Sequence, residues 1–111
     1  MSTSDNSQLL PGTLFMLILR ILSRGPLHGY AIARRIQEIS KNDLQIEDGS
    51  LYPALNRMLV KGWLKAEWGT SENNRRARFY SLTREGRQQL ESEAAEFDKL
   101  VRAIQLVMRS A

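Results

Sequence analysis

The stretch SLYPALNRMLVKGWLKAEW, residues 50–68, contains a change of hydrophobic period that decides the fold. Its first part has apolar side chains at helical spacing, which predicts a helix over about Ser50 to Lys61. Pro53 favours a start at this point, because proline in a first turn lacks only an N–H that has no helical partner. Beyond Gly62, the apolar residues of Leu64 to Trp68 alternate with charged ones, which is typical of a strand. A helix followed directly by a strand is therefore predicted.

A second strand is predicted over Arg78 to Leu82, after a segment rich in turn-forming residues, Gly69 to Ala77. The two runs together indicate a β-hairpin with a long, exposed and cationic tip. Phe79 and Tyr80 point to opposite faces of the second strand, so either face could be the buried one. Trp68, on the first strand, is expected in the core.

Two helices are predicted before the opening stretch. The first runs from Leu14 to Leu22, where apolar side chains surround most of the helix, with Gly12 and Thr13 at its start and Thr13 as the N-cap. The second runs from about His28 to Ile39. Its core-facing side chains are expected to be Tyr30, Ile32, Ala33, Ile36 and Ile39.

A long final helix is predicted from Thr83, a natural N-cap, to about Arg109. Roughly 27 residues make a helix about 40 Å long, which is more than the core of one small domain needs. Its apolar residues recur with the alternating spacing of a heptad seam, namely Leu90, Ala94, Phe97, Val101, Ile104 and Met108. A second copy of the chain is the simplest partner for this seam, so a homodimer is expected.

The composition limits the kinds of chemistry that the chain can perform. Its 111 residues have no cysteine, which excludes disulfides, thiolate catalysis and cysteine-based metal sites. His28 is the only histidine and the carboxylates do not cluster, so neither a metal nor a cofactor is expected. Because the chain also lacks a glycine-rich phosphate loop, an enzyme is not expected.

The order helix, helix, helix, hairpin, helix is that of a winged helix-turn-helix followed by a dimerisation helix. The expected fold is therefore mainly α with a small β-hairpin (α+β). Residues 1–8 are expected to form a disordered arm, residues 9–82 the DNA-binding domain and residues 83–111 the dimerisation helix. The start lacks the features of a secretory signal, and the run Leu14 to Leu19 is too short to span a bilayer. A cytoplasmic location without a membrane partner is expected.

The positive charge is concentrated in one part of the chain. Residues 49–88 hold eight basic and three acidic residues, a net charge of +5, whereas the other residues together carry −1. A segment of this kind suits a polyanion such as double-stranded DNA. A solvated basic surface is the alternative.

The third helix has the shape of a helix that enters the major groove. Its outward side chains could contact base edges or phosphates, and they are Ser50, Tyr52, Pro53, Asn56, Arg57 and Lys61. The hairpin tip would then serve as the wing, with guanidinium groups along the phosphates or in a narrow minor groove. Its candidates are Asn73, Asn74, Arg75, Arg76 and Arg78. A solvated hairpin turn is the alternative for these arginines.

His28 and Tyr30 lie near the start of the second helix. There they could donate to a phosphate, because the free N–H groups of a helix N-terminus favour an anion. In the alternative interpretation Tyr30 packs in the core and His28 is merely exposed.

Four motifs in this order resemble those of the PadR family of bacterial regulators. They are Leu10-Pro-Gly-Thr13, Gly25-Pro26 with His28-Gly-Tyr30, Gly49-Ser-Leu-Tyr-Pro-Ala-Leu55, and Glu72-Asn-Asn-Arg-Arg-Ala-Arg-Phe-Tyr-Ser-Leu-Thr83 with Gly86. The resemblance implies that Ser50 to Lys61 is the recognition helix, Leu64 to Leu82 the wing and the last helix the dimer contact. It is closest to the short subgroup with a single final helix. It also implies a dimeric repressor on a palindromic operator.

Members of this family often respond to small molecules, and the short subgroup can bind flat aromatic drugs through a tryptophan on the last helix. Here Trp63 and Trp68 both precede that helix, whose only aromatic residue is Phe97. A small-molecule effector therefore has no support in the sequence. Because a fold does not determine a function, a winged-helix protein-interaction module that does not bind DNA is the alternative.

Overall fold

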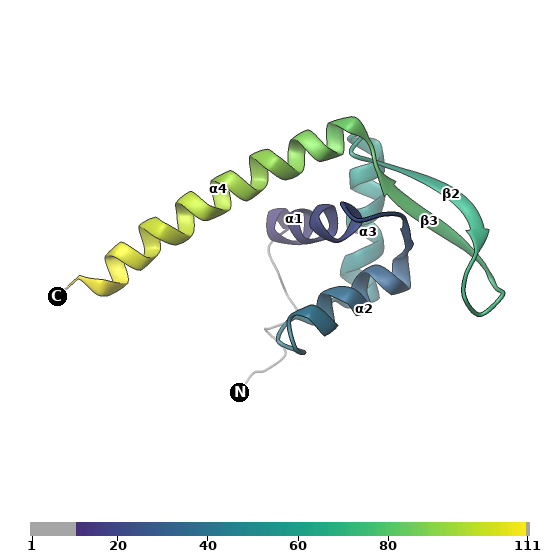
Figure 1. The fold of residues 1–111 in the computed structure, drawn as a ribbon, viewed down its shortest axis with the longest axis horizontal. Helices are drawn as coiled ribbons and strands as arrows, with labels where there is room; N and C mark the ends of the chain where they lie inside the picture. The colour runs from purple at the N-terminus through teal and green to yellow at the C-terminus, as the bar shows by residue number, and fades with distance from the viewer. Residues whose placement is uncertain (1–10, 111) are drawn as a thin grey trace.

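The computed structural model describes residues 11–110, so the expected arm at residues 1–8 lies outside the described residues. The elements in chain order are α1 (Pro11–Leu22), β1 (Leu27–His28), α2 (Gly29–Ile39), α3 (Asp48–Val60), β2 (Leu64–Thr70), β3 (Arg76–Leu82) and α4 (Arg84–Arg109) (Figure 1). The chain is thus mainly helical with one small antiparallel sheet. This arrangement confirms the predicted winged helix-turn-helix with a long C-terminal helix.

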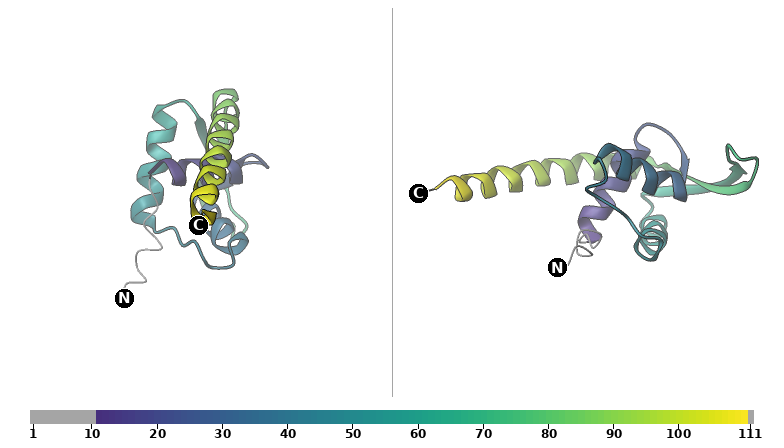
Figure 2. Two further views of the ribbon diagram at one scale, coloured as in Figure 1. Left: turned by 90° about the vertical axis from the view of Figure 1, so that its left-hand side faces the viewer. Right: turned by 90° about the horizontal axis from the view of Figure 1, so that it is seen from below.

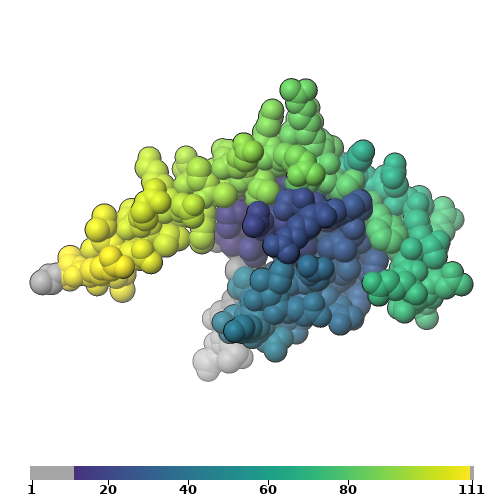
Figure 3. Space-filling view, in the orientation of Figure 1, coloured from purple at the N-terminus to yellow at the C-terminus, as the bar shows by residue number. Residues whose placement is uncertain are grey.

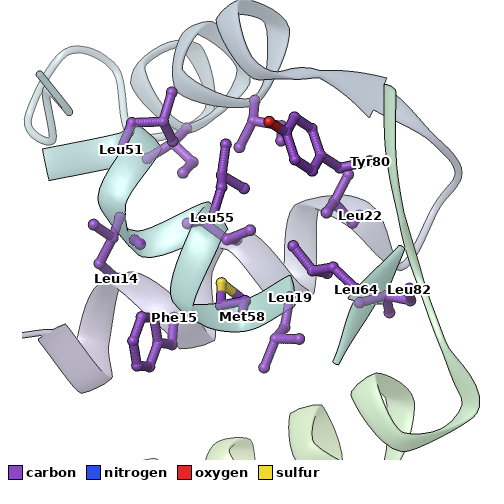
Figure 4. Close-up of a cluster of buried hydrophobic side chains, with 14 residues drawn as sticks. Leu14, Phe15, Leu19, Leu22, Leu51, Leu55, Met58, Leu64, Tyr80 and Leu82 are labelled. Carbon is purple, nitrogen blue, oxygen red and sulfur yellow. The ribbon is translucent and has the colours of Figure 1, made fainter. Parts of the chain in front are cut away.

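Three helices and the base of the sheet enclose one hydrophobic core. Leu51, Leu55 and Met58 of α3 are fully buried and pack with the apolar face of α1 (Figure 4). Tyr80 and Leu82 of β3 close the core from the sheet side. Since Tyr80 is buried, the face of β3 that carries it faces the core, which decides between the two faces that alternation alone allowed.

The sheet has the strand order β1-β3-β2, and both pairings are antiparallel. The hairpin register runs from Leu64 opposite Leu82 to Thr70 opposite Arg76. The expected tip over Gly69 to Ala77 was therefore too long, because the ladder continues through residues that also favour turns, and only residues 71–75 form the turn. The sequence did not predict β1, which is only two residues long.

Three side chains that were expected in the core are exposed. Trp68 is 62% exposed, and Tyr30 and Ile39 are each 61% exposed. Trp68 lies beyond the point where the hairpin leaves the domain, so its face of the strand no longer meets any helix. On α2 the buried stripe consists of Gly29, Ile32 and Ile36, and Tyr30 and Ile39 lie outside it.

Two helix starts also differ from the prediction. The first helix begins at Pro11, so Thr13 lies inside it and is not its N-cap. The third begins at Asp48, two residues before Ser50. In both cases the hydrophobic period shows where a helix is buried and says little about the exposed turn before it.

The predicted start of the last helix is confirmed. The Thr83 hydroxyl accepts the Gly86 N–H at 3.0 Å and donates to the Gly62 carbonyl at 2.6 Å. A Cβ at residue 86 would overlap the carbonyl oxygen of Trp63. Thr83 and Gly86 therefore join the start of α4 closely to the turn between α3 and β2, and this contact sets the direction in which α4 leaves the domain.

Candidate nucleic-acid interface

The outward face of α3 is exposed as the sequence predicted. Leu51, Leu55 and Met58 face the core. All six candidates of this segment are exposed, and they are Ser50, Tyr52, Pro53, Asn56, Arg57 and Lys61. The buried stripe of α3 therefore packs against the core and fixes the position of the helix. Its polar and basic side chains are free to meet a ligand.

The two cations at the C-terminal end of this segment lie over aromatic rings. The Arg57 guanidinium carbon is 5.6 Å from the centroid of the Phe15 ring, and the Lys61 ammonium nitrogen is 5.3 Å from that of Trp63. Exposed cation–π contacts contribute about 0.5–1 kcal/mol each. Both cations are thus positioned along the edge of α3 that borders α1 and the turn into β2.

Tyr52 connects the start of α2 to the outward face of α3. A Cβ on residue 29 would lie 2.7 Å from a carbon of the Tyr52 ring, so Gly29 makes room for this ring. Burial, and to a smaller degree Asp48 and Tyr80, raises the pKa of the Tyr52 phenol above its ordinary value. The hydroxyl therefore stays protonated at neutral pH and can donate a hydrogen bond.

The wing is formed by β2, β3 and their turn, and one of its faces is buried near the domain and exposed farther out. Near the domain this face carries the core residue Tyr80, and farther out it carries Trp68, Arg76 and Arg78. The Arg76 guanidinium lies 4.7 Å from the centroid of the Trp68 ring, and that of Arg78 lies 5.9 Å from the Tyr80 ring. Because the core-facing side of the sheet is the side of the helices, these arginines project on the same side of the hairpin as α2 and α3.

The turn of the wing presents Asn73, Asn74 and Arg75, which are all exposed. Asn74 has a φ of 59°, a left-handed conformation that asparagine tolerates better than most residues. The Ser71 N–H donates to the Arg75 carbonyl at 2.8 Å and closes the turn. The predicted cationic tip is therefore a short, hydrogen-bonded turn.

His28 caps α2, and Tyr30 is exposed beside it. Nδ1 of His28 accepts the Ala31 N–H at 3.4 Å, so Nε2 carries the proton of the neutral ring and is free to donate. The two rings are stacked with centroids 6.4 Å apart. Arg34 adds a cation 5.7 Å from the centroid of the Tyr30 ring. The interpretation that placed Tyr30 in the core is therefore wrong.

A polar hollow of about 290 Å³ lies between α2 and the turn of the wing. It brings His28 and Tyr30 together with Asn73, which lies more than 40 positions later in the sequence. None of the α3 candidates lines this hollow. Its lining residues are Leu27, His28, Tyr30, Ala31, Arg34, Arg35, Glu38, Ser71, Glu72 and Asn73.

Trp68 and Arg34 join the site although sequence reasoning did not single them out as binding residues. The alternation of the two strands does place Trp68 on the same face as Arg76 and Arg78. That alternation could have identified Trp68 only if the outer limit of the core had also been known. Arg34 lies one turn after Tyr30 on α2, and the i, i+4 spacing is the signal that could have found it.

The C-terminal half of α4 projects away from the domain (Figures 1 and 2). Of the described residues, those of α1 and β3 make the main contacts with α4. Most of the predicted seam is exposed in the single chain, including Phe97, Ile104 and Met108. In the described part of the chain, no helix combines the length and hydrophobicity needed to cross a membrane.

The chain is similar to known transcriptional regulators. A family model described as the transcriptional regulator PadR-like family matches residues 18–92. The structure of a PadR family transcriptional regulator from Eggerthella lenta has a TM-score of 0.77 and 29% identity, covering 90% of this chain and 85% of that one. A PadR family transcription regulator from Clostridium difficile has a TM-score of 0.75 and 29% identity, covering 86% of this chain and 97% of that one.

A curated relative, a 37.1 kDa protein in a transposon of Streptomyces fradiae, is 40% identical over 85 residues, which are 77% of this chain. The chain spans only 23% of the length of that relative. The matched residues 18–92 are more than half of the chain and include α2, α3 and the wing. The chain therefore belongs to the PadR-like family of transcriptional regulators.

Proposed function

We propose that the protein is a sequence-specific DNA-binding repressor that binds a palindromic operator as a homodimer. The observation that carries this proposal is the pair of exposed polar and cationic elements, the outward face of α3 and the face of the wing with Arg76 and Arg78. Both lie on the helix side of the sheet, so one duplex could meet them together. Phosphates favour such basic surfaces.

The proposed roles follow from the side chains on each element. Ser50, Tyr52 and Asn56 are hydrogen-bonding groups for base edges or phosphates, and Pro53 lies between them on the same exposed turn. Arg57 and Lys61, held over their aromatic rings, supply phosphate contacts at the other end of the helix.

The wing and the start of α2 would contact the backbone on either side of α3. Arg75, Arg76 and Arg78 bind phosphates or enter the minor groove, with Asn73 and Asn74 as further donors. His28 and Tyr30 donate to a phosphate at the N-terminus of α2, which the exposed Tyr30 hydroxyl and the free Nε2 of His28 support.

Two copies joined through α4 would place their α3 helices in successive major grooves, about 34 Å apart. Occupancy of the operator would then block transcription. The exposed seam residues Ala94, Phe97, Ile104 and Met108 support the dimer, whereas Leu90 packs partly against the core of its own chain. The proposal includes no catalytic step, and the two solved structures named above are of transcriptional regulators.

The test is a salt titration of operator binding by the wild type and by the double variant Arg75→Ala/Arg76→Ala. The slope of log K against log salt is negative, and each lost phosphate contact makes it shallower by about 0.9. A dimer that loses four contacts should therefore have a slope that is shallower by about 3 to 4 units. Affinity should fall for all sequences alike. Fluorescence anisotropy of labelled duplexes measures both quantities.

Asn56→Ala is the contrasting variant, because it should change sequence preference and leave the salt slope unaltered. Arg20→Ala/Arg24→Ala, with exposed arginines at the end of α1, is the matched control for charge and should behave as the wild type. If the wing variant binds with an unchanged slope, the wing contacts no DNA. If the wild type binds no duplex even at low salt, the protein-interaction module is the better interpretation.

A further inference from the structure

Val60 is the last residue of α3, and its side chain is 88% exposed, more than any other large hydrophobic side chain in the described part of the chain. No other described element lies beyond α3 in the two side views of the molecule (Figure 2), whereas Figure 3 shows the opposite face, with α2 in front. The outer surface of α3 is therefore open to a ligand, and Val60 is part of that surface.

The side chains of α3 that point directly away from the core form a narrow stripe. At 100° per residue they fall within a sector of about 60°. We call this the outer stripe, and it consists of Gly49, Pro53, Asn56 and Val60. Val60 lies within about 10° of the point opposite the centre of the buried residues of the helix. In a helix that lies in the major groove, the side chains opposite the core are those that point at the base edges.

We propose that Val60 is a specificity-determining residue whose methyl groups contact the C5 methyl group of a thymine in the operator. This inference rests on the DNA binding proposed above. It names one feature of the sequence that α3 recognises, a thymine at a fixed position of each half-site.

The chemistry of the major groove selects this partner for a valine. The side chain of valine has no hydrogen-bond donor or acceptor, so it cannot read the polar groups of a base edge. The C5 methyl of thymine is the apolar group that base pairs present in the major groove. Contact between the two removes apolar surface of both from water. A cytosine in the same place would turn its amino group toward Val60 and leave that donor without a partner.

The neighbours of Val60 suit the last turn of α3 to a position against DNA. Asn56, Arg57, Val60 and Lys61 line an open hollow of about 320 Å³ on the surface of this segment. Arg57 and Lys61 lie on one flank of the outer stripe, and both are held over aromatic rings. When these cations bind phosphates, they bring the hollow, and Val60 with it, close to the base edges. The amide of Asn56, one turn before Val60, can then read a neighbouring base.

The same surroundings argue against a protein partner for Val60. The exposed groups beside it are an amide, a guanidinium and an ammonium, and these do not form the contiguous apolar patch that marks a protein interface. Two exposed cations favour a polyanion instead. DNA is therefore the occupant that the charge of this surface selects.

The test removes the thymine methyl without changing base pairing. Duplexes that bind the wild type are selected from a random library, and each thymine of the selected operator is replaced in turn by deoxyuridine, which lacks only the C5 methyl. At one thymine of each half-site the replacement should weaken binding about fourfold, and about fifteenfold when both half-sites are changed. Fluorescence anisotropy of labelled duplexes measures these ratios.

Val60→Ala tests whether Val60 is the residue that reads this methyl. The variant should bind the thymine operator within about twofold of the affinity that the wild type has for the deoxyuridine operator. Deoxyuridine at the same position should weaken the variant no further, because the contact has already been lost. Alanine favours a helix more than valine does, so the variant should fold, and circular dichroism checks this.

Ile39→Ala is the matched control for the loss of an exposed β-branched side chain. Ile39 is 61% exposed at the end of α2, and it belongs neither to α3 nor to the wing. This variant should respond to deoxyuridine as the wild type does.

The outcomes separate this inference from the proposed function. If deoxyuridine weakens the wild type and Val60→Ala equally at every position, another residue reads the methyl and the role of Val60 is wrong. If no deoxyuridine weakens the wild type, α3 reads no thymine methyl, although the DNA-binding regulator stands. If the wild type selects no duplex and binds none at low salt, the proposed function itself is wrong.

Discussion

Trp68 shows how one exposed aromatic residue can organise a cationic surface. Its ring supports the guanidinium of Arg76 at 4.7 Å, on the face of the wing that also carries Arg78. An arginine held in this way loses less side-chain freedom when it binds a phosphate, so part of the entropic cost of binding has already been met.

Trp68→Ala should therefore weaken operator binding by about two- to fivefold, the equivalent of a cation–π contact of about 0.5–1 kcal/mol. Fluorescence anisotropy with a labelled operator measures this change. Trp68→Tyr keeps an aromatic face and should retain most of the affinity. Equal affinity of the alanine variant and the wild type would show that Arg76 does not depend on this ring.

At this scale the sequence predicted the exposure of every α3 candidate, because a helix with a buried stripe has a defined outer face. It was wrong about Trp68 and Tyr30. Strand alternation identifies the face of a residue, but it does not show where along the strand the core ends. The limit of the core depends on helices that are distant in the sequence.

Among the elements, the junction between the wing and α4 leaves the least room for an added side chain. The Thr83 hydroxyl bonds both Gly62 and Gly86, and the backbone of residue 86 lies against the Trp63 carbonyl. A backbone atom cannot move aside as a flexible side chain does. Any side chain at residue 86 must therefore displace the start of α4.

Gly86→Ala should destabilise the protein by about 1–3 kcal/mol, the usual cost of overpacking. Urea denaturation followed by circular dichroism measures the free energy of unfolding. Gly12→Ala is the control, because a Cβ there meets nothing within 4 Å and should be neutral or stabilising by up to about 1 kcal/mol. A Gly86→Ala protein as stable as the wild type would refute the close contact.

The whole molecule extends well beyond its core, with principal dimensions of 56 × 36 × 21 Å. The wing and the distal half of α4 project from opposite sides of the domain (Figure 1). Each projection presents groups that the domain itself does not satisfy, cations on the wing and apolar residues on α4. These are the two surfaces that the proposed function assigns to DNA and to a second copy.

Ile104→Glu should produce monomers that still fold, because Ile104 is already 49% exposed in the single chain. Operator affinity should fall by about a hundredfold or more, since the two half-sites no longer bind as a unit. Sedimentation velocity and anisotropy measure the two effects. Lys99→Glu, on the outer side of α4, should change neither. A dimeric Ile104→Glu protein would rule out the seam.

The sequence by itself determined the order of the elements, the outward face of α3, the Thr83 cap and the seam of α4. These features depend on residues within a few turns of one another, so periodicity and capping suffice to predict them. Only the tertiary structure decided which face of β3 is buried, where the core stops along the wing, that β1 pairs with β3, and that His28 and Asn73 line one hollow. These features depend on contacts between segments far apart in the chain, whose distances no local pattern records.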